Sequence, residues 1–222
     1  MNSWSNERFW AVLPAIWDGF IVVLQVTLVA AIIAIVVGLL VALAEREGPP
    51  WLRRPVSLLF QFIRNTPLLV QVLIVWTATS YYINPDWSAF IVGSSVLGIH
   101  YASYTSESYR AGIDAIPKGQ WEAATALNLP AHRVWIAIIL PQMLRRSTAA
   151  VGNWLIAMFK EVPTLFIIGV MEMIAQAKAY QGLHYAGAVE GYTIAGILFL
   201  AASYPVAVAM RRLENRLARS NF

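Results

Sequence analysis

Long apolar stretches alternate with short polar ones along the whole chain. A helix that crosses a bilayer needs about 20 mostly apolar residues. Five stretches approach or exceed that length, at about 20–44, 56–80, 89–113, 148–174 and 192–210. The first is almost entirely valine, isoleucine, leucine and alanine, whereas the third carries several serines and charged residues. The pattern predicts an all-α integral membrane protein with about five transmembrane helices, forming one domain over residues 1–222.

The composition narrows the class of protein. Of the 222 residues, 59% are hydrophobic and only 13% are charged, a balance that few soluble folds tolerate. The net charge of +4 does not indicate nucleic-acid binding, because the basic residues gather at the ends of apolar stretches, where membrane topology requires them. The chain has no cysteine, and its three histidines lack metal-ligand spacing. We therefore expect no metal site.

The basic residues also predict the orientation in the membrane. One set of loops carries Arg46, Arg53, Arg54, Lys118, Arg133, Arg145, Arg146, Arg211, Arg212, Arg216 and Arg219. The opposite set carries only Arg8 and Lys178. Cytoplasmic loops hold the excess of lysine and arginine, so the N-terminus is predicted outside and the C-terminus inside. The loop between the third and fourth stretches is then cytoplasmic.

That central loop, residues 117–141, has the pattern of two short helices separated by a turn. Pro117 suits the first position of a helix, and Asn128 tolerates the left-handed conformation of a C-terminal cap. Pro130 can open the second helix, and Pro141 is expected to close it. Most connections are far shorter, so we expect this segment to have a function of its own. An amphipathic helix lying on the membrane surface is the alternative.

The same loop resembles the EAA loop in the permease subunits of bacterial ABC importers. The resemblance rests on Glu122-Ala123-Ala124, position 128, Ile138 and Leu140-Pro141. The family usually has glycine where this chain has Asn128. Asparagine is the next-best residue for a left-handed cap, so we expect the turn to be retained.

The resemblance implies partners. In that family the loop contains a coupling helix that docks into a separate ATPase subunit. The residues implied to contact the ATPase are Lys118, Gln120, Glu122, Ala123, Ala124, Asn128, Leu140 and Pro141. Also implied are two ATPase subunits, a second permease (identical or homologous) and an extracytoplasmic substrate-binding protein, assembled at the cytoplasmic membrane of a bacterium. The chain itself has no Gly-x4-Gly-Lys-Ser/Thr phosphate loop. ATP and magnesium are therefore expected in the partner ATPase, and no cofactor or enzymatic activity in this chain.

A second stretch narrows the resemblance to the polar amino-acid type of permease. It is Arg64-Asn65-Thr66-Pro67, followed by Gln71. Pro67 removes a backbone hydrogen bond from the second apolar stretch. Freed carbonyls at membrane depth are tolerated only against protein or a water-filled path, which makes these residues candidates for lining the substrate path. A snorkelling arginine beside a tolerated kink explains them equally well.

Charged residues within the apolar stretches are further candidates, because a charge at membrane depth is costly. Glu107 and Arg110 lie three residues apart, on one helix face, and are predicted to form a structural ion pair. Lys160 and Glu161 lie about 12 residues, or roughly 18 Å, into the fourth stretch. We hypothesise that Glu161 and Asn153 line the substrate path and that Lys160 holds a structural ion pair.

The predicted function is that of a permease subunit in an ATP-driven, binding-protein-dependent importer. Its substrate would be a polar amino acid or related zwitterion, glutamine-like or ectoine-like, moved by alternating access. The alternative is an ATP-independent channel or secondary transporter, for which five helices are few and no inverted repeat is visible. The sequence shows no Ser–His–Asp or paired-carboxylate arrangement to support a membrane enzyme.

Overall fold

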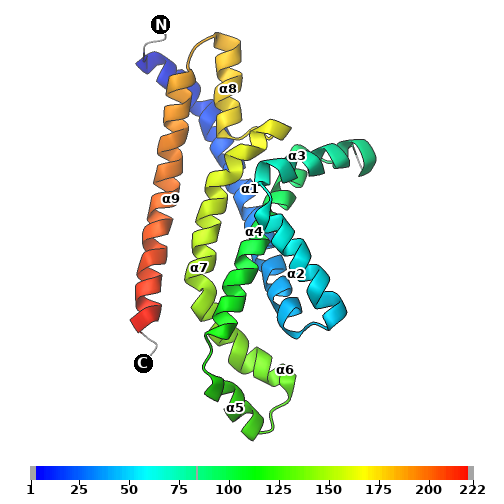
Figure 1. Ribbon diagram of the computed structural model, residues 1–222. Coiled ribbons are helices and arrows are strands. Elements are labelled where there is room, and N and C mark those ends of the chain that lie inside the picture. Colours follow the sequence, from blue (N-terminus) through cyan, green and yellow to red (C-terminus); the bar gives the residue numbers. More distant parts are fainter. Residues whose placement is uncertain (1–3, 84, 220–222) are drawn as a thin grey trace.

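The computed structural model describes residues 4–83 and 85–219, with side chains up to 216 (Figure 1). All regular secondary structure in these residues is helical, which confirms the predicted all-α class. The elements are α1 (Asn6–Glu47), α2 (Pro50–Asn65), α3 (Leu68–Ala78), η1 (Thr79–Ile83), α4 (Ala89–Asp114), α5 (Lys118–Ala126), α6 (Ala131–Arg133), η2 (Val134–Ile139), α7 (Leu140–Glu161), η3 (Val162–Ile168), α8 (Met173–His184) and α9 (Ala188–Arg219).

Helices α1 and α4 pack against each other along most of their length at the centre of the molecule. Small residues bring the two backbones close. A Cβ atom added to Gly98 of α4 would lie 2.7 Å from the Ile33 Cβ and 2.9 Å from the Ala30 carbonyl oxygen. The Thr105 hydroxyl of α4 donates a hydrogen bond of 2.7 Å to the Ala34 carbonyl of α1. Close approach of this kind is the usual way in which membrane helices gain packing contacts.

Hydropathy alone identifies only part of this bundle. In the described residues, three helical segments are long and apolar enough to cross a membrane, namely Asn6–Glu47, Ala131–Ile168 and Ala188–Arg216. The bent pair of α2 and α3 makes a fourth if it is counted as one span. Helix α4 does not pass the same test, although its 26 residues correspond to about 39 Å of helix.

Helix α4 is polar because it lies inside the protein. Its serines and threonine at 94, 103, 105 and 106 are buried. The Ser103 hydroxyl donates to the His100 carbonyl at 2.6 Å, and the Ser106 hydroxyl to the Ser103 carbonyl at 2.9 Å. Bonds of this kind to the preceding turn satisfy the hydroxyls of Ser103, Thr105 and Ser106 within the helix itself, whereas the buried Ser94 hydroxyl has no partner in the described residues. The helix can therefore be buried against α1 and α7 without exposing polar groups to lipid.

Two predicted stretches differ from the helices that form. Stretch 56–80 is not one straight helix, because α2 and α3 meet at a 111° bend next to Pro67. Stretch 148–174 does not coincide with one helix, because α7 begins at Leu140 and ends at Glu161. Pro163 then interrupts α-helical hydrogen bonding. The chain continues as the 3-10 helix η3 and turns at Gly169, which has a φ of 92°.

The central loop forms as predicted at its turn but not at its end. Asn128 adopts a φ of 54°, the left-handed conformation expected of it. Pro117 precedes α5 as its N-cap instead of occupying the first position. Pro141 does not close the second helix, which runs through the π-helical segment η2 into α7. Proline has no backbone N–H to donate, and the wider π-helical turn before Pro141 lets the helix continue without that hydrogen bond.

The two ends of the bundle carry different elements. Figure 1 shows the start of α1, the start of α9 and all of α8 at one end, with α5, α6 and the end of α9 at the other. The predicted placement of the central loop and the C-terminus on one side agrees with this arrangement. Which end faces the cytoplasm stays a prediction.

Glu190 joins α9 to α1 at the N-terminal end of both helices. Its carboxylate accepts hydrogen bonds from the Ser5 backbone N–H at 2.8 Å and from the Arg8 Nε at 3.1 Å. The side chain is only 3% exposed. Because the carboxylate is ionised and enclosed, its loss removes charge-assisted hydrogen bonds and leaves a guanidinium with less compensation.

We expect Glu190→Ala to lower the melting temperature of the purified protein in detergent, through a loss of about 2 kcal/mol. The matched control is Glu7→Ala, which removes an exposed carboxylate from the first turn of α1. Thermal unfolding followed by circular dichroism measures both variants. Equal melting temperatures for the two variants would contradict a stabilising role of Glu190.

Candidate functional site

Helix α5 presents most of the residues that the EAA resemblance implies as ATPase contacts. Lys118, Gln120, Glu122 and Ala123 are exposed, as is Asn128 in the following turn. Ala124 is an exception, because it is 3% exposed and faces the protein's own interior. A bulky residue at Ala124 would thus disturb the fold of the loop itself. Ala123 is the small residue available to a partner.

Aromatic and polar contacts hold α5 against the bundle. Trp121 of α5 packs edge-to-face on Trp135 of η2, with ring centroids 5.7 Å apart. The Gln142 side-chain amide of α7 donates to the Gln120 side-chain oxygen at 3.1 Å. Arg46 lies over the Trp121 ring at 5.9 Å. Helix α5 is therefore attached to α7 and to the end of α1.

Arg46 also forms an ion pair with Asp114, the last residue of α4. The ends of α1, α4 and α5 consequently meet at one guanidinium. Beside it lies a cleft of about 450 Å³ with side chains of both charges, lined by Arg46, Ile113, Asp114, Ile116, Lys118, Trp121 and Glu122. The base of the bundle thus offers an open, mixed-charge cleft next to an exposed helix. Of the last two implied contacts, Pro141 is exposed, whereas Leu140 packs into the apolar cluster near α5.

Gln71 closes the break between α2 and α3. Its side-chain nitrogen lies 2.6 Å from the Ile63 carbonyl oxygen, 3.1 Å from the Thr66 carbonyl oxygen and 2.5 Å from the Thr66 hydroxyl. Its oxygen lies 3.1 Å from Nδ1 of the buried His100. Carbonyls freed by Pro67 thus find their partner in the protein. Gln71 and Thr66 have a structural task here, while Asn65 and Pro67 are exposed beside them.

Glu107 bridges two arginines from different helices. It forms the predicted ion pair with Arg110 and a second one with Arg64 at 2.8 Å. The Tyr104 hydroxyl donates to the Arg64 carbonyl at 3.4 Å, which ties the end of α2 to α4. These groups border a cleft of about 570 Å³ whose polar and aromatic lining is Arg64, Tyr104, Glu107, Ser108, Arg146 and Trp154.

The other charged candidates are not gathered at that cleft. Lys160 and Glu161 are exposed at the end of α7. Within the described residues Lys160 forms no salt bridge, so the expected structural ion pair is absent there. Two turns before Glu161 on α7, Trp154 packs on Tyr104 of α4, with ring centroids 4.5 Å apart. Asn153 is directed to α9, where its amide donates to the Glu214 carboxylate at 3.1 Å.

The family follows from comparison with known proteins. The model of the family described as "Binding-protein-dependent transport system inner membrane component" matches residues 34–219. The chain belongs to this family. The recognition made from the EAA loop is thereby confirmed, as is the multi-pass location in the cytoplasmic membrane. Membership also defines a transport component that works with an ATPase and a substrate-binding protein.

Individual relatives agree with this assignment. The chain is 37% identical over 172 residues to a protein of Sinorhizobium fredii named as a probable amino-acid ABC transporter permease, covering 76% of this chain and 72% of that protein. It is 32% identical over 171 residues to a putative glutamine transport system permease of Rickettsia felis, covering 77% and 78%. A solved structure described as an amino acid ABC transporter with histidines superposes with a TM-score of 0.87 at 28% identity, covering 96% and 99%.

Sequence reasoning missed several residues of the site. The sequence pattern identifies Arg46 and Arg146 only as topology residues and His100 only as one of three histidines without metal-ligand spacing, and it does not single out Gln142. The four-residue spacing of His100 and Tyr104 is the one local signal, because it places both on one face of α4. Their rings lie 5.5 Å apart. Their partners Gln71 and Arg64 come from other helices, which no local pattern reveals.

Replacing Gln71 by leucine is expected to destabilise the bend. The Ile63 carbonyl would keep the Thr66 hydroxyl as a donor. The Thr66 carbonyl would lose the Gln71 amide, at a cost of about 1–3 kcal/mol for a group left unsatisfied. The matched control is Gln61→Leu, because Gln61 is exposed and, among the residues that the structure describes, its side chain bonds only to the neighbouring Ser57 hydroxyl. Thermal unfolding in detergent should show a clear decrease for Gln71→Leu alone. A decrease of the same size for both variants would contradict the capping role.

Proposed function

We propose that this chain is a permease subunit of an ATP-driven importer for a polar amino acid, of the glutamine-like type. The observation that carries the proposal is helix α5, held at the base of the bundle with a row of exposed residues in the EAA pattern. The amino-acid and glutamine names of the relatives support the substrate class. The proposed assembly contains two permeases, identical or homologous, two ATPases and one substrate-binding protein.

The proposed orientation places α5 and the C-terminus in the cytoplasm. ATP-driven closure of the ATPases would move α5, and the contacts around Arg46 would pass that movement to α1 and α4. Arg46 touches both Trp121 of α5 and Asp114 at the end of α4. Because α1 and α4 are closely packed, they would move as one rigid body. Alternating access then follows from reorientation of that body, a two-state transition biased by nucleotide.

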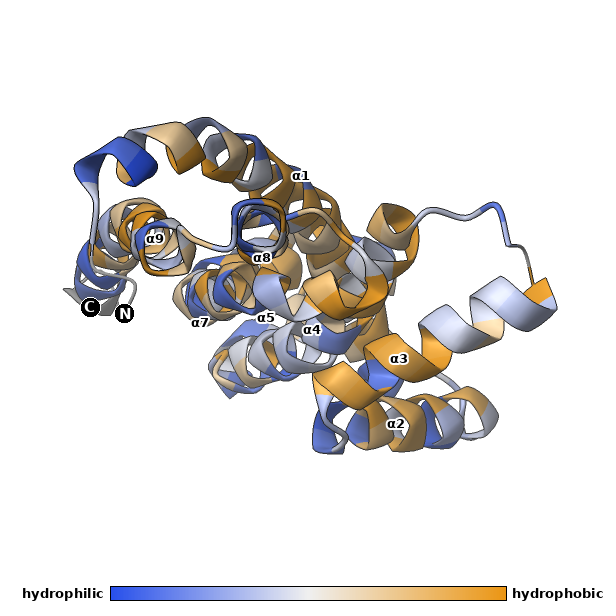
Figure 2. Cartoon of the chain, turned by 90° about the horizontal axis from the view of Figure 1, so that it is seen from above, coloured by the Kyte–Doolittle hydropathy of each residue, from blue (hydrophilic) through white to orange (hydrophobic). Residues whose placement is uncertain are grey.

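Helix α3 supports a second permease as a partner. Seen from above, α3 extends away from the other helices and is largely apolar (Figure 2). Leu69, Ile74 and Val75 are exposed on it, and Tyr81 and Tyr82 follow in η1 with 79% and 87% exposure. A protruding apolar arm of this size requires cover by lipid or by protein. We assign that cover to the neighbouring permease.

The substrate path is proposed to run between the two permeases, beside Glu161. Glu161 is exposed at the end of α7, and a carboxylate is costly against lipid. If Glu161 instead faces a polar path, where it can meet the amino group of a zwitterion, that cost is removed. The aromatic side chains of Tyr101, Tyr104 and Trp154 lie in the same region, with Tyr104 and Trp154 ring centroids 4.5 Å apart. Such rings suit a cationic amino group.

Ala123→Trp is expected to release the ATPase. The tryptophan would fill space that the docking surface needs, while the spans stay folded because Ala123 is exposed. The measurement is a pull-down of the tagged chain from its host in mild detergent, scored for the ATPase. Ala179→Trp is the matched control, since Ala179 is exposed on α8 at the opposite end. Retention of the ATPase by Ala123→Trp at the control level would contradict docking on α5.

Glu161→Gln is expected to reduce ATP-driven uptake of glutamine into proteoliposomes by about tenfold, a loss of roughly 1.4 kcal/mol in transition-state stabilisation. Assembly with the ATPase should be unchanged. The control is Glu47→Gln, an exposed carboxylate at the end of α1. Equal uptake by both variants would remove Glu161 from the path. Uptake by the wild-type assembly without ATP would instead favour a secondary transporter.

A further inference from the structure

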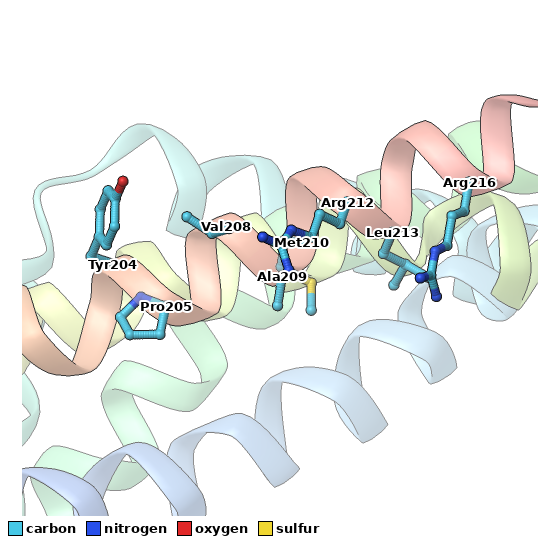
Figure 3. A pocket seen from close by; sticks show the side chains of 8 residues that line it. All are labelled: Tyr204, Pro205, Val208, Ala209, Met210, Arg212, Leu213 and Arg216. Carbon is cyan, nitrogen blue, oxygen red and sulfur yellow. The ribbon is translucent and has the colours of Figure 1, made fainter.

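Helix α9 carries a groove that is apolar at one end and basic at the other. The groove has a volume of about 640 Å³. Its apolar end is formed by Tyr204, Pro205 and Val208, and its basic end by Arg212 and Arg216 (Figure 3). From Tyr204 to Arg216 the helix rises by about 18 Å, close to the roughly 15 Å of hydrocarbon in one leaflet. The groove therefore has the length and polarity of a phospholipid.

The two arginines have no partner within the described residues, where neither forms a salt bridge or a hydrogen bond. They lie four residues apart, on one face of α9, so that their like charges repel each other. The nearby Glu214 does not neutralise them. It lies about 200° around the helix from Arg212 and accepts the Asn153 hydrogen bond from α7. An anion between the guanidinium groups would relieve this repulsion.

A second groove meets the first at Met210. It has a volume of about 410 Å³ and lies between α1, α7 and α9. Its lining includes Leu28, Ile156 and Val206, and no charged residue. Met210 lines both grooves. Val206 and Met210 lie on another face of α9, roughly 120–160° around the helix from Arg212, so the second groove does not lead to the arginines and the first groove alone carries the inference.

We infer that α9 holds one anionic phospholipid, with its phosphate between Arg212 and Arg216 and an acyl chain along the groove formed by Tyr204, Pro205 and Val208. Guanidinium groups bind phosphate through charge-assisted, often bidentate, hydrogen bonds. The C-terminus of α9 is proposed to be cytoplasmic, and the cytoplasmic leaflet is the one rich in anionic lipids. A free phosphate ion has no apolar part and would leave the apolar end of the groove unoccupied.

The test uses the permease with its ATPase in nanodiscs that contain equal amounts of phosphatidylglycerol and phosphatidylcholine. Native mass spectrometry of the released complex counts the lipids that stay bound. The wild type is expected to retain phosphatidylglycerol over phosphatidylcholine by roughly thirtyfold, because each of the two arginines contributes about 1 kcal/mol near an anionic surface. The double variant Arg212→Gln/Arg216→Gln should lose this preference. Equal retention of both lipids by the wild type would overturn the inference.

The matched control is Arg211→Gln, which removes one positive charge from the same turn of α9 outside the groove lining. It should keep the preference for phosphatidylglycerol. If Arg211→Gln lowers the preference as far as the double variant does, general attraction by the basic end of α9 explains the retention and the inference is wrong.

The apolar part of the inference is tested with Ala209→Trp, which places a large side chain in the first groove at an exposed position. We expect it to lower phosphatidylglycerol retention while both arginines remain. Unchanged retention would exclude the acyl chain from that groove. A photo-crosslinker introduced at Val208 should attach to lipid, and attachment to a protein subunit would overturn the inference. Loss of ATP-driven uptake in the wild type would count against the proposed function but not against this lipid site.

Discussion

Within a bilayer every backbone polar group needs a partner inside the protein, and this constraint shapes the bundle at its most unusual positions. At the 111° bend between α2 and α3, the freed carbonyls are bound by the Gln71 side chain. In the buried helix α4, serine hydroxyls bond back to the preceding turn, and Thr105 reaches the α1 backbone. Irregular and polar elements can therefore occur in the interior of an otherwise apolar molecule.

Satisfying these groups also connects the helices. The carbonyls at the bend are linked through Gln71 to His100 of α4, and Arg64 at the end of α2 is linked through Glu107 to the same helix. Helix α4 in turn packs closely on α1. Polar contacts thus make α1, α2 and α4 one unit, while α3 projects from it and α5 is attached at its base. A unit with a fixed interior and attached peripheral elements is suited to rigid-body movement.

The positions of charged side chains decided most of the differences between expectation and structure. Glu107 pairs with Arg110, which its own helix places one turn away, but also with Arg64 from α2. Asn153 and Glu161 lie on the same helix, yet Asn153 bonds to α9 while Glu161 is exposed beyond it. Helical spacing shows which residues share a face. It does not show which neighbour that face meets.

The sequence by itself determined the all-α membrane class, the short helix of the central loop and the left-handed turn at Asn128, because these depend on local properties: apolar length, capping preference and a short contiguous motif. The family could be recognised for the same reason. Only the tertiary structure decided that Gln71 caps the helix break, that Ala124 is buried and that Arg46 joins α5 to α1 and α4. Each of these contacts joins residues or surfaces whose pairing depends on how the helices pack, which the chain fixes only once it has folded.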